Sequence, residues 1–344
     1  MNKTLISIFA LLALMVTNCF AQGESFINTA ELQTRIDWQR DQIGGDKRDS
    51  ESGFKGRYLN LILKGDITDN ISYAYRQRFS KPFGTGKFFD ATDWLYLTWK
   101  ATDKLAISGG KEIVALGGFE YDYAPIDVYG ATEFWNNIPC YQFGGSVAYS
   151  VSSHDQFTAQ LVQSPFRNDS TDLYAYNLRW NGNHGALSTI WSVSMLEYQP
   201  GKYINYIVLG NQFDFGKGHI IIDYQNRYAK GNGAAFFGDF TLNTEIHIQP
   251  TKQVNVFAKY AIDQNLRNQG DYCVFAGTKQ HHAGIGVEYF PLKGRKDLRL
   301  HANAYHTWGK NTNPAGTNQD KQTTFNLGLT WKADLLNIRK LIKK

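Results

Sequence analysis

The chain has 344 residues, a formal net charge of +5, and a composition that is 15% aromatic and 19% charged. After Ala21 no apolar run approaches the ~20 residues that a membrane helix requires, which excludes a helical membrane protein. Three cysteines are too few for a disulfide framework, and with so mild a basic excess we expect no nucleic-acid partner.

The first residues predict export from the cytoplasm. Lys3 precedes a largely apolar run from Leu5 to Phe20, and Ala21 supplies a small residue at the cleavage position. This pattern is typical of a secretory signal peptide over residues 1–21. The alternative is a lipoprotein signal with the lipid on Cys19, although Asn18 before it is a poor fit to such a site.

Period-two alternation of apolar and polar residues recurs along the rest of the chain. In the first segment Ile36 and Trp38 alternate with Arg35 and Asp37, which predicts a strand with two different faces. The weakest segments are 105–112, 187–197 and 203–213. The sixteen predicted strands are 31–40, 57–64, 71–79, 94–100, 105–112, 142–151, 156–164, 173–180, 187–197, 203–213, 219–228, 238–248, 254–263, 281–290, 298–308 and 322–332.

The predicted connections alternate between short turns and longer polar loops. Links such as 65–70 and 101–104 are short, whereas 41–53, 80–90 and 113–141 are long; 165–172 and 199–202 are shorter than the rule requires. An even number of strands with this alternation predicts an all-β, antiparallel transmembrane barrel in the outer membrane of a Gram-negative bacterium, with both termini on the periplasmic side. The alternative is a soluble β-sandwich or propeller.

The predicted barrel domain covers residues 22–332 and leaves a basic tail over 333–344. In this tail Leu335, Ile338 and Ile342 fall near helical spacing with lysines and Arg339 alongside. Such a segment fits either a short helix lying on the inner leaflet or a frayed periplasmic end.

The two faces of the predicted strands carry different chemistry. The apolar face has aromatic residues near strand ends, which suit the two lipid–water boundaries. They are Trp38, Phe79, Trp99, Tyr149, Trp180, Tyr228, Phe240, Trp308 and Trp331. The polar face places nine bases in the lumen: Arg35, Lys64, Arg76, Arg78, Lys100, Arg179, Arg227, Lys259 and Arg299. The inward acids are Asp37, Glu112, Asp223, Glu245, Asp263 and Glu288.

The cationic excess of the predicted lumen favours passage of anions, because Arg and Lys lining a pore attract them. The alternative is that each base pairs with a neighbouring acid and only stiffens the wall. The longest loop, 113–141, contains glycines, aromatic residues and four carboxylates. Folded inward, Glu120, Asp122, Asp127 and Glu133 would face the basic wall and create a transverse field suited to general diffusion of small polar solutes. The alternative is an outward loop that covers a subunit interface.

Two segments resemble the phosphate-selective porin O and P family, in forms met in Bacteroidota. They are the hairpin from Leu63 to Phe79 and the Gly109-Gly110-Lys111-Glu112 strand end before the long loop. The resemblance implies a sixteen-stranded, trimeric porin with an inward third loop and a basic ladder that guides anions such as phosphate. It places Arg76, Arg78 and Lys111 where ladder residues lie.

Other functions find less support in the sequence. No G-x-S-x-G, P-loop or H-E-x-x-H motif is present, so we expect no enzyme, no cofactor and no metal. His282 and His301 are predicted to point inward and His306 outward, which favours a structural role over a metal site. A disulfide between Cys140 and Cys273 is not expected, because the two loops lie roughly opposite in the ring and are too far apart for bridging unless both fold inward.

Two alternatives to a passive, anion-preferring porin remain open. One is a substrate-specific pore, for instance for sugars, with Tyr58, Tyr96 and Tyr305 as stacking surfaces in the lumen. The other is a hydrolase on the barrel wall, for which His301 has polar neighbours but no recognisable serine partner.

Overall fold

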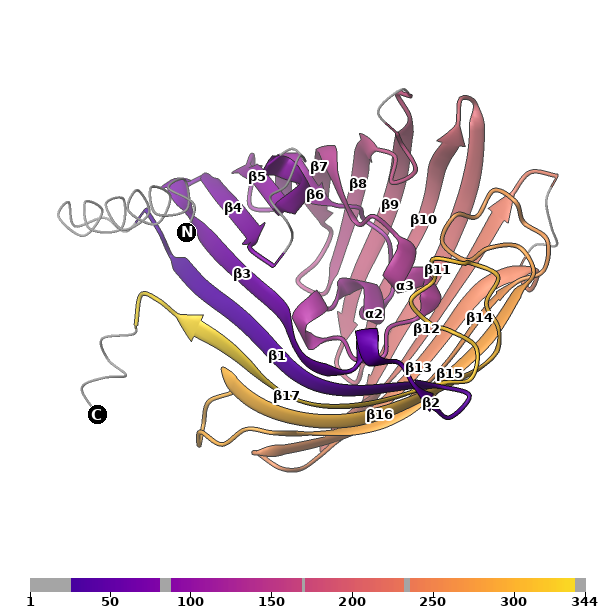
Figure 1. The fold of residues 1–344 in the computed structure, drawn as a ribbon. Helices are drawn as coiled ribbons and strands as arrows, with labels where there is room; N and C mark the ends of the chain where they lie inside the picture. The colour runs from indigo at the N-terminus through magenta and orange to yellow at the C-terminus, as the bar shows by residue number, and fades with distance from the viewer. Residues whose placement is uncertain (1–25, 81–87, 169–170, 232–235, 338–344) are drawn as a thin grey trace.

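The computed structural model describes residues 26–80, 88–168, 171–231 and 236–337. Within these ranges a single antiparallel sheet closes on itself, because β1 pairs with β3 on one side and with β17 on the other (Figure 1). Sixteen long strands form the wall, as predicted, and the two-residue β2 (Asp46–Lys47) lies in the first loop.

The long strands exceed most of the predicted lengths by a few residues. Their bounds are β1 Thr29–Ile43, β3 Gly53–Thr68, β4 Ile71–Arg78, β5 Thr92–Lys100, β6 Leu105–Ile113, β7 Tyr141–Ser150, β8 Asp155–Gln163, β9 Tyr174–His184, β10 Leu187–Gln199, β11 Lys202–Asp214, β12 Gly218–Ala229, β13 Asp239–Thr251, β14 Val254–Asn265, β15 Thr278–Tyr289, β16 Leu298–Lys310 and β17 Gln322–Asp334.

The connections alternate as the sequence predicts. One rim carries short turns such as 69–70, 101–104, 185–186 and 252–253, and the other carries the long segments 114–140, 266–277 and 311–321. The connection 200–201 on the long-loop rim is a tight turn. The predicted signal peptide, residues 1–21, and residues 338–344 of the predicted tail lie outside the described residues. None of the described helices has the length and apolarity needed to cross a bilayer.

The barrel wall has an apolar outer face and a largely polar inner face. In β1 the inward Arg35 and Asp37 are 6% and 0% exposed, whereas the outward Ile36 and Trp38 are 51% and 40% exposed. The nine aromatic residues predicted for the outer face are all partly or fully exposed. Such surfaces suit contact with lipid, which cannot hydrogen-bond to polar groups.

The inner face is apolar along part of β10 and β11, where we expected a polar lumen. Leu196, Ile204, Tyr206 and Val208 point inward and are fully buried. Their partners are apolar side chains of the long segment 114–140, which packs on this part of the wall. Apolar residues on both faces explain why the alternation in 187–197 and 203–213 is mixed: each strand contacts lipid outside and an apolar cluster inside.

The orientation of β5 gives a direct test of the lipid-facing register. Leu97 points outward and is 50% exposed, and its neighbour Thr98 points inward toward Ser108. We expect Leu97→Arg to lower the free energy of unfolding by about 1–2 kcal/mol, because a cation is placed against lipid between the midplane and the boundary at Trp99. The matched Thr98→Arg is expected to have a much smaller effect. Urea titration of the protein folded into phospholipid vesicles measures both, and equal losses would contradict the register.

Candidate solute pathway

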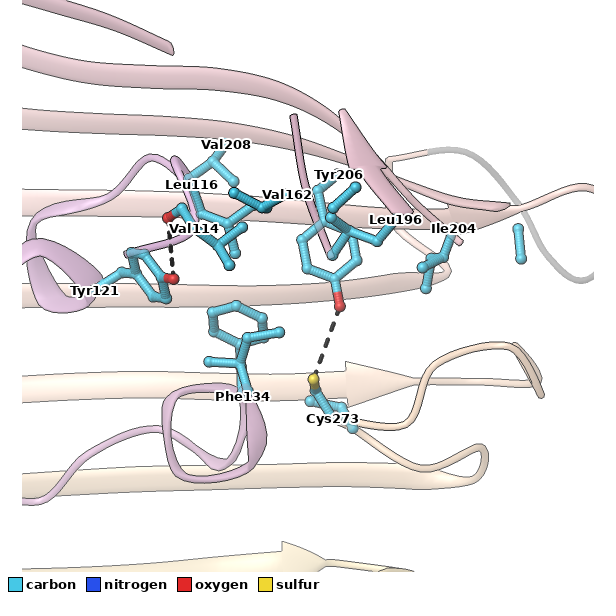
Figure 2. Packing of buried hydrophobic residues seen from close by; sticks show 14 residues of the cluster. Val114, Leu116, Tyr121, Phe134, Val162, Leu196, Ile204, Tyr206, Val208 and Cys273 are labelled. Carbon is cyan, nitrogen blue, oxygen red and sulfur yellow. Dashed lines mark hydrogen bonds between the residues drawn. The ribbon is translucent and has the colours of Figure 1, made fainter. Parts of the chain in front are cut away.

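The segment 114–140, called loop 3 here, lies inside the barrel (Figure 1). It contains α2 (Phe119–Asp122), η3 (Pro125–Asp127) and α3 (Glu133–Asn137). Leu116 and Phe134 are fully buried in the cluster with β10 and β11. Figure 2 shows Phe134 facing Tyr206, and their ring centroids are 5.9 Å apart. Loop 3 therefore folds into the barrel rather than outward.

Two carboxylates on the wall hold the short helices of loop 3. Asp223 of β12 accepts hydrogen bonds from the backbone N–H groups of Phe119 and Glu120, each at 2.8 Å. Asp263 of β14 accepts them from Glu133 at 2.8 Å and Phe134 at 3.4 Å. The first N–H groups of a helix have no partner within it and carry partial positive charge. Each aspartate therefore satisfies two donors and fixes one end of loop 3.

Three of the four predicted loop carboxylates form ion pairs with bases of the wall. The pairs join Glu120 to Lys259, Asp122 to Arg179, and Asp127 to both Arg299 and Lys332. Glu120 is 3% exposed, and its burial raises the pKa of this carboxyl despite the opposing effect of Lys259. These pairs attach loop 3 to the wall. They also neutralise much of the charge from which we expected a transverse field in the lumen.

The fourth carboxylate, Glu133, faces amides rather than a base. Its oxygens accept from Asn137 Nδ2 at 2.8 Å, from Asn313 Nδ2 at 3.4 Å and from the backbone N–H of Asn318 at 3.3 Å. Burial raises the pKa of Glu133, and the bond from Asn137 opposes this effect. Asn313 and Asn318 belong to the segment 311–321, so this segment also reaches into the barrel and contacts α3.

In two clusters of the lumen, two arginines share a single carboxylate. Arg76 and Arg78 both contact Asp93, at 2.6 and 2.7 Å, which leaves one formal positive charge. Arg35 and Arg57 both contact Asp37, at 2.9 and 3.5 Å, with the same result. These clusters lie on the wall formed by β1 to β5.

The opposite imbalance occurs on the wall formed by β12 to β14. Arg227 contacts Asp239 and Asp271, and Lys259 contacts Glu120 and Glu245, so each base meets two carboxylates. All six residues are buried. The lumen thus carries its excess positive charge on one wall, and its excess negative charge is buried on the other.

The remaining predicted bases lie at different heights of the barrel, with Lys64 and Lys100 toward the short-turn rim. Lys64 and Lys100 are exposed, and no carboxylate of the described residues lies within 4.0 Å of either. Arg179 and Arg299 contact loop 3, as described above. Lys111 donates to the carbonyl of Phe89 at 2.6 Å.

Arg57 is a lumen residue that the alternation did not reveal. The register of β1 and β3 shifts between Arg35 and Ile36, and Arg57 falls in this bulge. The extra residue turns its side chain inward to Asp37 and Gln39. A strict period of two places Arg57 on the lipid face, and only the observed pairing corrects it.

Two cavities lie on either side of α3, and Trp135 and Asn136 of this helix line both. Cavity 1 has a volume of about 420 Å³ and is bordered by β1, β3, β15, β16 and β17. Cavity 2 has about 450 Å³ and is bordered by β4 to β8, including Arg78, and by Arg167 of the following loop. Both therefore adjoin the wall that carries excess positive charge.

The three histidines have the predicted orientations, whereas the two cysteines lie closer to each other than the loop order suggests. His282 and His301 are buried inside and His306 is exposed outside, and the described residues hold no group of three or more potential metal ligands. Cys140 and Cys273 are free thiols that both contact the apolar cluster of loop 3. Burial raises the pKa of both thiols.

A closed sixteen-stranded barrel, with a third loop folded into a charged lumen, defines an outer-membrane porin. The model of the phosphate-selective porin O and P family matches residues 29–202, which is half of the chain, and the chain belongs to this family. A comparison of this chain with the curated proteins found no match.

Solved structures of other outer-membrane proteins share the fold at low sequence identity. An anion-selective porin from Comamonas acidovorans is 13% identical with a TM-score of 0.64, covering 89% of this chain and 99% of that one. The outer membrane channel DcaP of Acinetobacter baumannii is 12% identical with a TM-score of 0.60, covering 89% and 97%. OmpT of Vibrio cholerae in a trimer form is 14% identical with a TM-score of 0.59, covering 89% and 99%.

The anchoring of loop 3 by two aspartates predicts the effect of removing them. We expect Asp223→Ala with Asp263→Ala to raise single-channel conductance and current noise, because four backbone donors lose their acceptors, at about 1–3 kcal/mol each. Asp66→Ala, an exposed change at the short-turn rim, is the matched control. Recording in planar bilayers checks this, and an unchanged conductance in the double variant would show that the apolar packing alone holds loop 3.

Proposed function

We propose that this porin admits small hydrophilic solutes by passive diffusion and prefers anions such as phosphate. The observation that carries the preference is the pair Arg76 and Arg78 on the single carboxylate Asp93. Arg78 lines cavity 2 together with Arg167, for which the described residues show no ion pair. The lining of cavity 2 also includes Lys111, so a solute there meets three cationic side chains against the two carboxylates of Asp90 and Asp93.

The positions of the carboxylate-rich clusters also support the preference for anions. The clusters in which carboxylates outnumber bases lie under loop 3 and line neither cavity, whereas the Asp93 and Asp37 clusters border cavities 2 and 1. Walls of low dielectric focus the field of the accessible charges into the lumen. Arg76 is also held rigidly, because its guanidinium lies 4.0 Å from the ring centroid of Trp94.

The nine predicted bases are spread along the height of the barrel. Arg76 and Arg78 lie toward the long-loop rim, Arg35 and Lys259 near mid-height, and Lys64 and Lys100 toward the short-turn rim. We propose that the accessible members of this set form the ladder that anions follow, and that Arg227 and Lys259, buried with two carboxylates each, hold the wall and loop 3 together instead. The family match and the channel neighbours favour transport over hydrolysis.

Neutralising one member of the Asp93 cluster tests the proposed preference. We expect Arg78→Gln to lower the anion-to-cation permeability ratio, because Arg76 remains to pair with Asp93 and the cluster becomes neutral. Reversal potentials in a potassium chloride gradient measure the ratio, with Arg295→Gln in the 290–297 turn as control. A wild-type protein that selects cations, or an Arg78→Gln variant with unaltered selectivity, would contradict the proposal.

We further propose that the porin is a homotrimer embedded in outer-membrane lipid. A trimer form exists for the OmpT neighbour, and the outer face of the present barrel is apolar enough to contact either lipid or another protomer. Light scattering of the detergent-solubilised protein is expected to give three times the protomer mass, falling to one protomer after heat denaturation. A single protomer mass before heating would overturn the assignment.

A further inference from the structure

Cavity 1 differs from cavity 2 in the kind of polar group that lines it. Its lining is rich in uncharged hydrogen-bonding side chains, both amides and hydroxyls. The amides are those of Gln39, Asn136, Asn303, Asn318, Gln322 and Asn326. Amides combine donors and acceptors in one group, so they suit a ligand that itself offers both, such as a hydroxylated compound.

Every arginine that lines cavity 1 contacts a carboxylate. Arg48 contacts Asp41 at 3.3 Å, and Arg35 and Arg57 share Asp37 at 2.9 and 3.5 Å, which leaves one formal positive charge. Asp41 and Glu51 also line the cavity, so a bound phosphate would meet two carboxylates. Cavity 1 is therefore better suited to a neutral polar solute than to an anion.

Two buried side chains of cavity 1 have polar atoms without a protein partner. Neither ring nitrogen of His282 has a hydrogen-bond partner among the described residues, and nor has Nδ2 of Asn303. His282 is 4% exposed and Asn303 is 9% exposed. Buried polar groups are almost always hydrogen-bonded, and an unsatisfied one costs about 1–3 kcal/mol. These unpartnered atoms therefore indicate that the cavity accommodates a molecule that hydrogen-bonds to them.

Loop 3 is shaped to approach these groups closely. Gly130 has φ 50°, and a side chain there would lie 2.4 Å from the Tyr305 ring and 2.6 Å from His282 Nε2. Trp135, Tyr58 and Tyr305 add aromatic surface to the lining. The cavity thus combines apolar ring surface with uncharged hydrogen-bonding groups.

We propose that cavity 1 is a saturable binding site for a neutral saccharide. A pyranose presents C–H groups that pack on aromatic rings and hydroxyls that both donate to and accept from amides. The volume of about 420 Å³ is within the range of small-ligand sites. This inference rests on the proposed porin function, because the solute enters the cavity through the barrel mouth.

Maltose is the probe for a test in two independent assays. Calorimetric titration of the detergent-solubilised protein is expected to show saturable binding, and maltose is expected to reduce the ion current through single channels with the same concentration dependence. His282→Phe and Asn303→Leu each remove unpartnered polar atoms, and we expect each to weaken maltose binding about tenfold. The matched control, Gln142→Ala, changes cavity 2 only and is expected to bind maltose as the wild type does.

The possible outcomes separate this proposal from the porin function. Absent conductance with intact calorimetric binding would contradict the porin function and support the site. Equal maltose binding by the wild type and both cavity 1 variants would overturn the site, as would a non-saturating current reduction matched by a polyethylene glycol of similar size. Binding of inorganic phosphate, but not maltose, that His282→Phe abolishes would overturn the saccharide assignment.

Discussion

Closure of the sheet is the constraint on which the rest of the structure depends. Lipid offers no hydrogen bonds, so a strand that crosses it must pair on both edges, and β1 does so with β3 and β17. Once the sheet is closed, alternate side chains are fixed either in lipid or in the lumen. The outer face then has to be apolar, and every inward polar group has to find water, a solute or another part of the chain as its partner.

Loop 3 supplies many of those partners. It brings apolar side chains to β10 and β11, ion-pairing carboxylates to bases of β9, β14, β16 and β17, and helix N-termini to Asp223 and Asp263. Each contact uses a different interaction, and together they fix the loop at several points around the ring. A buried ion pair adds little net stability over an apolar alternative, but it penalises any displacement that separates its members. The loop is therefore better suited to dividing the lumen permanently than to opening and closing it.

The division by α3 produces two environments within one barrel. Cavity 2 adjoins two arginines that share one carboxylate, whereas the lining of cavity 1 is rich in amides and hydroxyls and includes the carboxylates Asp41 and Glu51. A single pore can in this way combine an electrostatic preference, which acts at a distance, with short-range recognition of uncharged groups. The separation of charge between opposite walls follows from the same arrangement, because loop 3 covers the wall on which carboxylates outnumber bases.

The sequence by itself determined the barrel, its sixteen long strands and the rims of its loops, because the alternation of side chains and the spacing of turns are local properties. It also placed residues such as Arg35 and Lys259 on the inner face. The partners of these residues were decided only by the tertiary structure, since Lys259 meets Glu120 across 139 positions of sequence. The bulge that turns Arg57 inward, the apolar inner face of β11 and the unpartnered nitrogens of His282 likewise depend on register and on where loop 3 packs. No local pattern encodes these features, because they arise between segments that come together only after the sheet has closed.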